Sequence, residues 1–256
     1  MHGTGNDFIV IDNFNGKINL STEQIVFLCD RHKGIGADGV ILVESHPTSD
    51  CFMNYINADG SKAKMCGNGV RSVAKFLKDF YLKDKKEFKI ATLDGIKNIK
   101  WEKENIFSVN MGKALFESED YNNAEKEIEG LPLEYATVGN PFAVAFVEKI
   151  EDYDLVTLGP KIENHKSFPN KINFELAEII NESELKVKTW ERGCGAVLAC
   201  GTGTCAVYAL FKKKNSIKED VVIHLPGGDL SLSQNKEGEI IMTGPAVSVF
   251  SSMIEL

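Results

Sequence analysis

Two cysteines, Cys66 and Cys200, each open a glycine-rich phrase of nearly the same sequence, 134 positions apart (200 − 66). The first phrase reads Cys-Gly-Asn-Gly and the second reads Cys-Gly-Thr-Gly. A thiol whose pKa is lowered into the working range can remove or return a proton. A chain that repeats such a thiol in matched surroundings is suited to a reaction that needs two similar acid–base groups.

Both cysteines come directly before a stretch that predicts a helix. Apolar residues recur with helical spacing at Val70, Val73, Ala74, Leu77 and Tyr81. After Cys200, residues 205–211 are apolar almost all round, which predicts a buried helix. Free N–H groups at a helix start stabilise a thiolate and bind a carboxylate, and glycines let the backbone approach a ligand closely. Two such helix starts at one substrate would place a sulfur on each face of its α-carbon, so that one thiolate removes the α-proton and the other thiol returns a proton to the opposite face.

The same offset links further pairs of residues. Asn6 and Phe8 match Asn140 and Phe142, and position 57 (Asn) matches position 191 (Glu). One offset without gaps indicates an internal duplication. We predict two domains, residues 1–115 with the first thiol and residues 116–256 with the second, and the last strand is free to pack back on the first half.

The pattern between the two helices is mostly one of strands and turns. A capping-box sequence at Ser21 predicts a helix through Cys29. We therefore predict an α+β fold, with a mostly antiparallel sheet and one central helix in each half. Residues 117–129 are acidic and polar, and we expect them to cover the domain junction. The clearest predicted strands are residues 9–11, 40–43, 53–57, 90–93, 107–111, 185–190, 221–225 and 240–242.

Composition argues against several kinds of partner. The chain has 256 residues, 43% of them hydrophobic, and a net charge of −8, which disfavours nucleic acid and anionic membranes as partners. We expect no transmembrane span and no signal peptide, and hence a cytoplasmic protein. The six cysteines form no Cys-x-x-Cys pair and have no histidine at zinc spacing, so we expect reduced thiols and no metal. We predict that Cys29, Cys51, Cys194 and Cys205 are buried structural residues.

Other polar residues each have two interpretations. Glu191 and Arg192 form either a surface ion pair or a pair that holds the ammonium and carboxylate of a substrate. An asparagine beside glycine is usually a turn residue. The asparagines at positions 6, 57 and 140 gain weight as site residues because each lies in a duplicated stretch, and Asn68 and Asn173 are further candidates.

The sequence closely resembles the diaminopimelate epimerase family. The matching stretches include Met-Cys-Gly-Asn-Gly-x-Arg, Trp-Glu-Arg-Gly and Ala-Cys-Gly-Thr-Gly, and they lie at residues 2–8, 31–39, 57–61, 65–71, 139–141, 190–195, 199–203 and 226–228. The resemblance implies two pseudo-symmetric domains, each a barrel-like sheet around a central helix. It also implies interconversion of LL- and meso-diaminopimelate without pyridoxal phosphate or metal, and frequent homodimers.

The resemblance also implies roles for single residues. Cys66 and Cys200 would be the two acid–base thiols. Residues at the two helix starts, Gly67, Asn68, Gly201 and Thr202, would hold the reacting carboxylate. The distal end of the substrate would be bound by Asn6, Asn57, Asn173 and Arg192, while Asn140 and Glu191 would border the reacting centre.

The chain departs from the family pattern at three places. Phe142 stands where the family usually has histidine, Ala196-Val197 replaces Glu-Thr, and the strand leading to His2 is short. A racemase of another amino acid, such as a thioether analogue or histidine, is therefore an alternative. Two other classes remain: a cysteine–histidine hydrolase or transferase, for which His32 is a weak candidate base, and a non-catalytic amino-acid binding protein that needs neither thiol.

Overall fold

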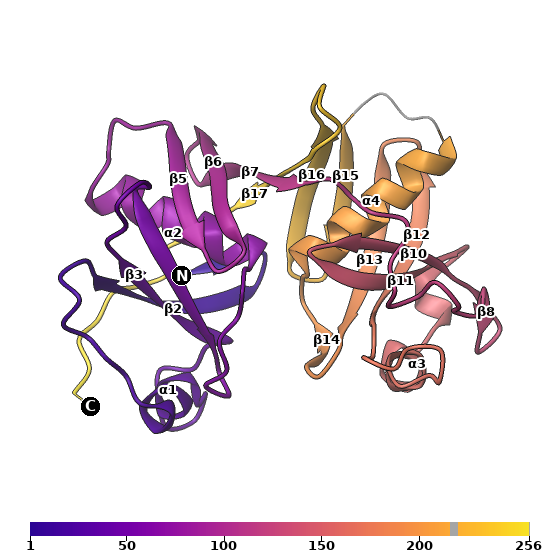
Figure 1. The fold of residues 1–256 in the computed structure, drawn as a ribbon, viewed down its shortest axis with the longest axis horizontal. Coiled ribbons are helices and arrows are strands. Elements are labelled where there is room, and N and C mark those ends of the chain that lie inside the picture. Colours follow the sequence, from indigo (N-terminus) through magenta and orange to yellow (C-terminus); the bar gives the residue numbers. More distant parts are fainter. Residues whose placement is uncertain (216–219, 256) are drawn as a thin grey trace. The chain divides into compact units, whose positions relative to one another are not determined.

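The computed structural model describes residues 1–215 and 220–255, and its contacts divide into two compact units (Figure 1). The first unit comprises Met1–Asn110 and Thr243–Leu256, and the second comprises Met111–Met242. The sequence analysis placed the division after residue 115 and left the last strand free to pack back on the first half. The structure divides the chain after Asn110 and again after Met242, where the chain returns to the first unit.

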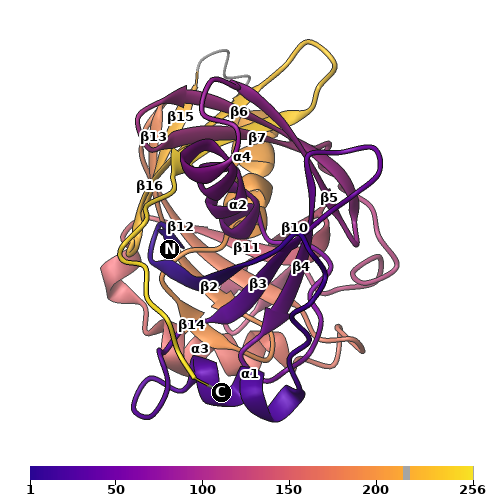
Figure 2. The ribbon, with the colours of Figure 1, turned by 90° about the vertical axis from the view of Figure 1, so that its left-hand side faces the viewer.

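The first unit is a mixed sheet around the helix α2 (Gly67–Phe80). Figure 2 shows its strands arranged around this helix, whose apolar side chains at positions 70, 73, 74 and 77 are almost fully buried. Strands β2 and β3 and strands β4 and β5 pair in parallel, and the other neighbours are antiparallel. The strands follow chain order: β1 (His2–Gly3), β2 (Asn6–Asn13), β3 (Gly39–Glu44), β4 (Cys51–Asn57), β5 (Glu87–Thr92), β6 (Gly95–Lys103) and β7 (Ile106–Gly112).

The second unit repeats this plan around the helix α4 (Gly201–Asn215). Its sheet has the order β16-β15-β13-β12-β11-β10, with β14 paired to β13. A separate hairpin consists of β8 (Glu127–Ile128) and β9 (Leu131–Pro132), and β17 (Ile240–Pro245) leads back to the first unit. The sheet strands are β10 (Glu134–Val138), β11 (Asn140–Val147), β12 (Asn173–Asn181), β13 (Glu184–Glu191), β14 (Gly195–Val197), β15 (Val221–Leu225) and β16 (Gly228–Gln234).

The predicted duplication is confirmed at the level of single residues. Strand β2 begins at Asn6 and β11 at Asn140, while α2 begins at Gly67 and α4 at Gly201, and both differences are 134. The strand register repeats as well, because Phe8 lies opposite Gly39 and Phe142 lies opposite Asn173. Corresponding positions in the two units can therefore be compared directly.

Each unit also carries a second helix beside its central one. A parallel strand pair needs a crossover connection, and α1 (Thr22–Cys29) lies between β2 and β3 as α3 (Leu155–Glu163) lies between β11 and β12. The capping box at Ser21 is present as predicted. Helix α3 was not predicted, since Gly159 and Pro160 interrupt its helical pattern. Gly159 is required for packing, because a β-carbon there would lie 2.1 Å from the ring of Trp190.

Residues 117–129 belong to the second unit, and Tyr121 and Ile128 lie in its core, only 6% and 4% exposed. One expectation needs correction. Cys194 is exposed rather than buried, because it lies in the turn between β13 and β14, whereas the cysteines at positions 29, 51 and 205 are buried as predicted. In the part of the chain that the structure describes, every helix is too short or too polar to cross a membrane.

Candidate active site

The first thiol lies at the start of α2. Cys66 is the N-cap residue of this helix, with extended backbone, and its sulfur accepts a hydrogen bond from the N–H of Gly69 at 3.4 Å. The thiol is also 3.5 Å from the side-chain oxygen of Asn6, to which it donates when protonated. A sulfur at a helix N-cap interacts with free N–H groups, which favour its thiolate form.

A buried network holds the groups around this thiol. Asn68, in the first turn of α2, donates to the oxygen of Asn6 at 3.3 Å and accepts from the guanidinium of Arg71 at 2.8 Å. Arg71 is fully buried and also donates to the carbonyl oxygens of Gly67 and Pro245. Arg71 closes the motif Met-Cys-Gly-Asn-Gly-x-Arg, and its hydrogen bond orients Asn68.

A surface ion-pair cluster fixes the other side of Asn6. The amide of Asn6 donates to the carboxylate of Asp38 at 2.6 Å, and Arg31 bridges Asp38 and Asp7. Asn57 lies at the end of β4 opposite Gly39, next to Asp38 in the chain, and its amide donates to the hydroxyl of Ser61 at 2.9 Å. Of the predicted residues in the first unit, the structure brings Asn6, Gly67 and Asn68 together with Cys66, while the side chain of Asn57 bonds to Ser61.

The second thiol lies directly before α4. The carbonyl of Cys200 accepts from the N–H of Thr204 at 2.9 Å, which closes the first turn, and its sulfur is 3.5 Å from the hydroxyl of Thr202. Burial raises the pKa of this thiol well above its ordinary value of 9, the carboxyl groups of Glu191 and Glu175 raise it further, and Thr202 lowers it. This thiol is therefore far harder to ionise than a free cysteine.

Asn173 joins two loops of the second unit. Its amide donates to the carbonyl of Pro141 at 2.9 Å, and its oxygen accepts from the backbone N–H of Arg192 at 3.1 Å. It thereby connects the turn that contains Asn140 to the end of β13. The guanidinium of Arg192 donates to the carbonyl of Asn170 at 3.0 Å.

Glu163 was missed by the sequence reasoning. It is 5% exposed, and its carboxylate accepts from the indole of Trp190 at 2.8 Å, the N–H of Gly193 at 3.1 Å and the ammonium of Lys171 at 3.0 Å. It fixes the turn that carries the predicted residues 191 and 192. Its only sequence signal was a place at the end of α3, a helix that was not predicted.

The structure shows where the residues that depart from the family pattern lie. Phe142, on β11, is 1% exposed, and its ring would lie 3.0 Å from a β-carbon built on Gly203 in the first turn of α4. It therefore packs beneath the start of the second helix. Ala196 and Val197 lie on the short strand β14, where Ala196 pairs with Trp190 and is exposed.

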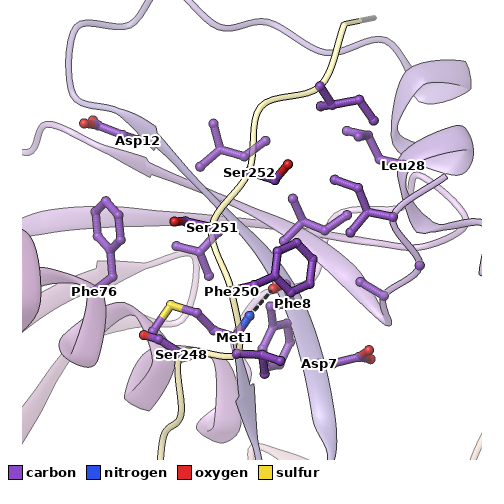
Figure 3. Close-up of a pocket in the computed structure, with 18 of the residues that line it drawn as sticks. Met1, Asp7, Phe8, Asp12, Leu28, Phe76, Ser248, Phe250, Ser251 and Ser252 are labelled. Carbon is purple, nitrogen blue, oxygen red and sulfur yellow. Dashed lines mark hydrogen bonds between the residues drawn. The ribbon is translucent and has the colours of Figure 1, made fainter.

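A hollow of about 840 Å³ lies elsewhere on the first unit (Figure 3). It is lined by residues of strand β2, by Leu28 of α1, by Phe76 and Phe80 of α2 and by residues 248–252 and 254, and the labelled side chains include Phe8, Leu28 and Phe250. None of the predicted site residues lines it. Among residues 1–215 and 220–255, no three histidine, cysteine or acidic side chains are grouped as a metal site requires.

The fold is that of a group of amino-acid racemases, epimerases and related proteins. A solved PhzF-family protein from Bacillus anthracis has a TM-score of 0.72 at 18% identity, with 99% of this chain and 95% of that chain covered. A hydroxyproline epimerase from Agrobacterium vitis has a TM-score of 0.66 at 15% identity, with 95% and 86% covered.

Sequence comparison identifies the family. The family model "Diaminopimelate epimerase" matches residues 1–117 and 134–249. The chain is 39% identical to a diaminopimelate epimerase of Methanococcus maripaludis strain C5 over 272 positions, with 100% of this chain and 98% of the relative covered. It is 40% identical to one from Carboxydothermus hydrogenoformans, with 98% and 96% covered. The chain belongs to the diaminopimelate epimerase family, and it is an isomerase of the epimerase class.

Proposed function

We propose that this protein interconverts LL- and meso-2,6-diaminopimelate with Cys66 and Cys200 as its two acid–base groups, without a cofactor, in the synthesis of lysine and peptidoglycan precursors. One observation carries the proposal: each thiol lies at the start of the central helix of its unit, at positions related by the duplication. The full-length similarity to curated diaminopimelate epimerases supports the choice of substrate.

The proposed reaction consists of two proton transfers. A thiolate takes the α-proton, so that the C–H bond breaks, an S–H bond forms, and the electron pair moves into the substrate carboxylate. Free N–H groups at the two helix starts stabilise the charge that develops there. The other thiol then gives its proton to the opposite face of the α-carbon, and the two sulfurs have exchanged their protonation states.

The remaining candidate residues suit the polar ends of the substrate. The guanidinium of Arg192 and the amides of Asn6, Asn57 and Asn173 match the carboxylate and ammonium of the distal end. Glu191 lies beside the Cys200 thiol and raises its pKa, as expected for a residue at the reacting centre. Asn140 begins β11, in the turn that Asn173 fixes.

One observation favours a second candidate of the same class. Phe142 is a buried apolar side chain beneath the second helix start, where the family usually has a histidine. A racemase of another amino acid, such as a thioether analogue or histidine, would use the same two thiols at the α-carbon of a substrate with a different side chain.

The first experiment incubates the reduced protein with LL-diaminopimelate in heavy water without added cofactor. We expect deuterium at the α-carbon and an approach to an LL/meso mixture, and we expect both Cys66→Ala and Cys200→Ala to abolish epimerisation. Cys194→Ala is the matched control, because this exposed cysteine lies outside the proposed chemistry. Turnover of another amino acid instead would favour the second candidate, while no turnover of any amino acid would favour a binding protein.

The homodimer and the cytoplasmic location stay predictions. Light scattering on the purified protein tests the first, since a dimer has twice the mass of one chain.

A further inference from the structure

A carboxyl group lies buried beneath the second thiol's helix without a full set of partners. Glu175, on β12, is 0% exposed, and one of its oxygens accepts from the hydroxyl of Thr189 at 2.7 Å. Its other oxygen, Oε1, has no hydrogen-bond partner among the described residues. An ionised carboxylate in such a place is costly, so the group favours its protonated form.

The contact with α4 is close enough to dictate a residue of the motif. A β-carbon at Gly203 would lie 1.7 Å from Oε1 of Glu175, far closer than two non-bonded atoms can approach. The second glycine of Cys-Gly-Thr-Gly is therefore required by the buried carboxyl group as much as by any ligand. The acid lies against the first turn of the helix that Cys200 precedes.

The first unit has no acid at the corresponding place. The offset of 134 relates Glu175 to Ile41 and Gly203 to Gly69, and a β-carbon at Gly69 would lie 3.3 Å from the end of the Ile41 side chain. The same offset relates Cys205 in α4 to the buried Arg71 in α2. The first thiol therefore has a buried cation nearby, and the second has a buried acid.

The charges around Glu175 oppose any further negative charge. Burial raises its pKa well above 4.5, the hydrogen bond from Thr189 lowers it, and the carboxylate of Glu191 raises it. The titratable groups that face it are Glu191 on β13 and Cys200 before α4, while β11 contributes the apolar Phe142. Glu175 and Cys200 are therefore coupled, because an ionised Glu175 and a Cys200 thiolate would place two negative charges in one buried region beside the carboxyl group of Glu191.

We propose that Glu175 is a positioning residue for Cys200, which keeps this sulfur in its protonated, proton-donating form in the free enzyme. The two thiols then enter the reaction in different states, Cys66 as the base and Cys200 as the acid. This inference rests on the proposed two-thiol function, but the ionisation of Cys200 is measured without any substrate.

The test compares Glu175→Gln, which keeps the shape of the side chain but cannot ionise, with Glu178→Gln as a matched control on the same strand. Each protein is treated with iodoacetamide over a range of pH, and the modification of Cys200 is followed by mass spectrometry of the peptide. We expect the midpoint pH for Cys200 to fall by about one unit or more in Glu175→Gln, so that alkylation near pH 8 becomes about tenfold faster. The midpoint pH is compared between proteins rather than the absolute rate, because the limited access of the reagent to Cys200 lowers the rate at every pH alike.

The controls make the result specific. Cys66 in Glu175→Gln and Cys200 in Glu178→Gln should keep their wild-type midpoints. An unchanged Cys200 midpoint in a folded Glu175→Gln protein overturns the proposal. If circular dichroism shows that this variant does not fold, Glu175→Ile, which copies the residue of the first unit, replaces it with the same two outcomes. A wild-type protein without epimerase activity would refute the proposed function but leave this measurement valid.

Discussion

The two units share one scaffold but surround their thiols with opposite charges. In the first unit, Cys66 contacts Asn6, and the neighbouring Asn68 is held by the fully buried Arg71. In the second unit, Cys200 lies with the carboxyl groups of Glu191 and Glu175, both of which raise its pKa. Duplication thus sets where the thiols lie, and later divergence of their neighbours sets which one ionises.

Arg71 and Cys205 occupy corresponding positions in the two units, and substitutions there should give the largest difference in stability between them. We expect Arg71→Met to lower the free energy of unfolding by about 3 kcal/mol or more, because the buried acceptors on Asn68, Gly67 and Pro245 lose their donor. Cys205→Ala, at the matching place in an apolar helix, should cost only about 1 kcal/mol. Urea unfolding of the two variants measures both values. Equal losses would contradict the expected difference between the two units.

The second glycine of each motif tests the contact beneath each helix. Gly203→Ala places a β-carbon on the buried carboxyl group of Glu175, so we expect a loss of about 2 to 3 kcal/mol. In Gly69→Ala the β-carbon approaches no atom closer than the flexible end of Ile41 at 3.3 Å, so this variant should cost less than about 1 kcal/mol. Adding Glu175→Ala should restore much of the stability lost in Gly203→Ala, and a double variant as unstable as the single one would contradict this contact.

Glu163 has Cys29 as its counterpart in the first unit, so its contribution is specific to the second unit. Burial raises the pKa of Glu163, but its bonds from Trp190, Lys171 and Gly193 lower it overall below 4.5. Its contribution to stability is therefore present above the ordinary pKa and is lost as pH falls through the lowered one. We expect Glu163→Gln to lower the free energy of unfolding near pH 7 by about 1 kcal/mol. Between about pH 5 and pH 3, the free energy of unfolding should fall less steeply in this variant than in the wild type, as measured by urea unfolding at each pH.

The two crossover helices give the smallest expected effects. Ser21 caps α1 through the N–H of Gln24, and Asp154 caps α3 through the N–H of Val156. Ser21→Ala and Asp154→Ala should each lower the melting temperature slightly, in line with a loss of about 1 kcal/mol or less, and the two losses should add. A clearly larger loss for one of them would show that the helices do not contribute equally to their units.

The residues around the thiols show what a sequence can and cannot predict. The helix starts followed from glycines and apolar spacing after Cys66 and Cys200, and the duplication followed from a constant offset. Glu175 was not foreseen, because it alternates with Phe174 and Leu176 and so has the pattern of a strand with one solvated face. Strand β12 has strands on both sides and α4 over that face, which only the tertiary structure supplies. Glu163 was not foreseen either, because it lies 30 residues before Gly193, from whose N–H it accepts a hydrogen bond.

The return of the chain to the first unit has a consequence for the order of folding during synthesis. Residues 111–242 are contiguous, so the second unit is complete before the first. The first unit needs Pro245 as an acceptor for Arg71 and needs Val247, which exchanges two backbone hydrogen bonds with His2 at 2.9 and 2.8 Å. During synthesis, therefore, the first unit begins to form first but is completed last. The buried guanidinium of Arg71 lacks one of its acceptors until Pro245 has been made.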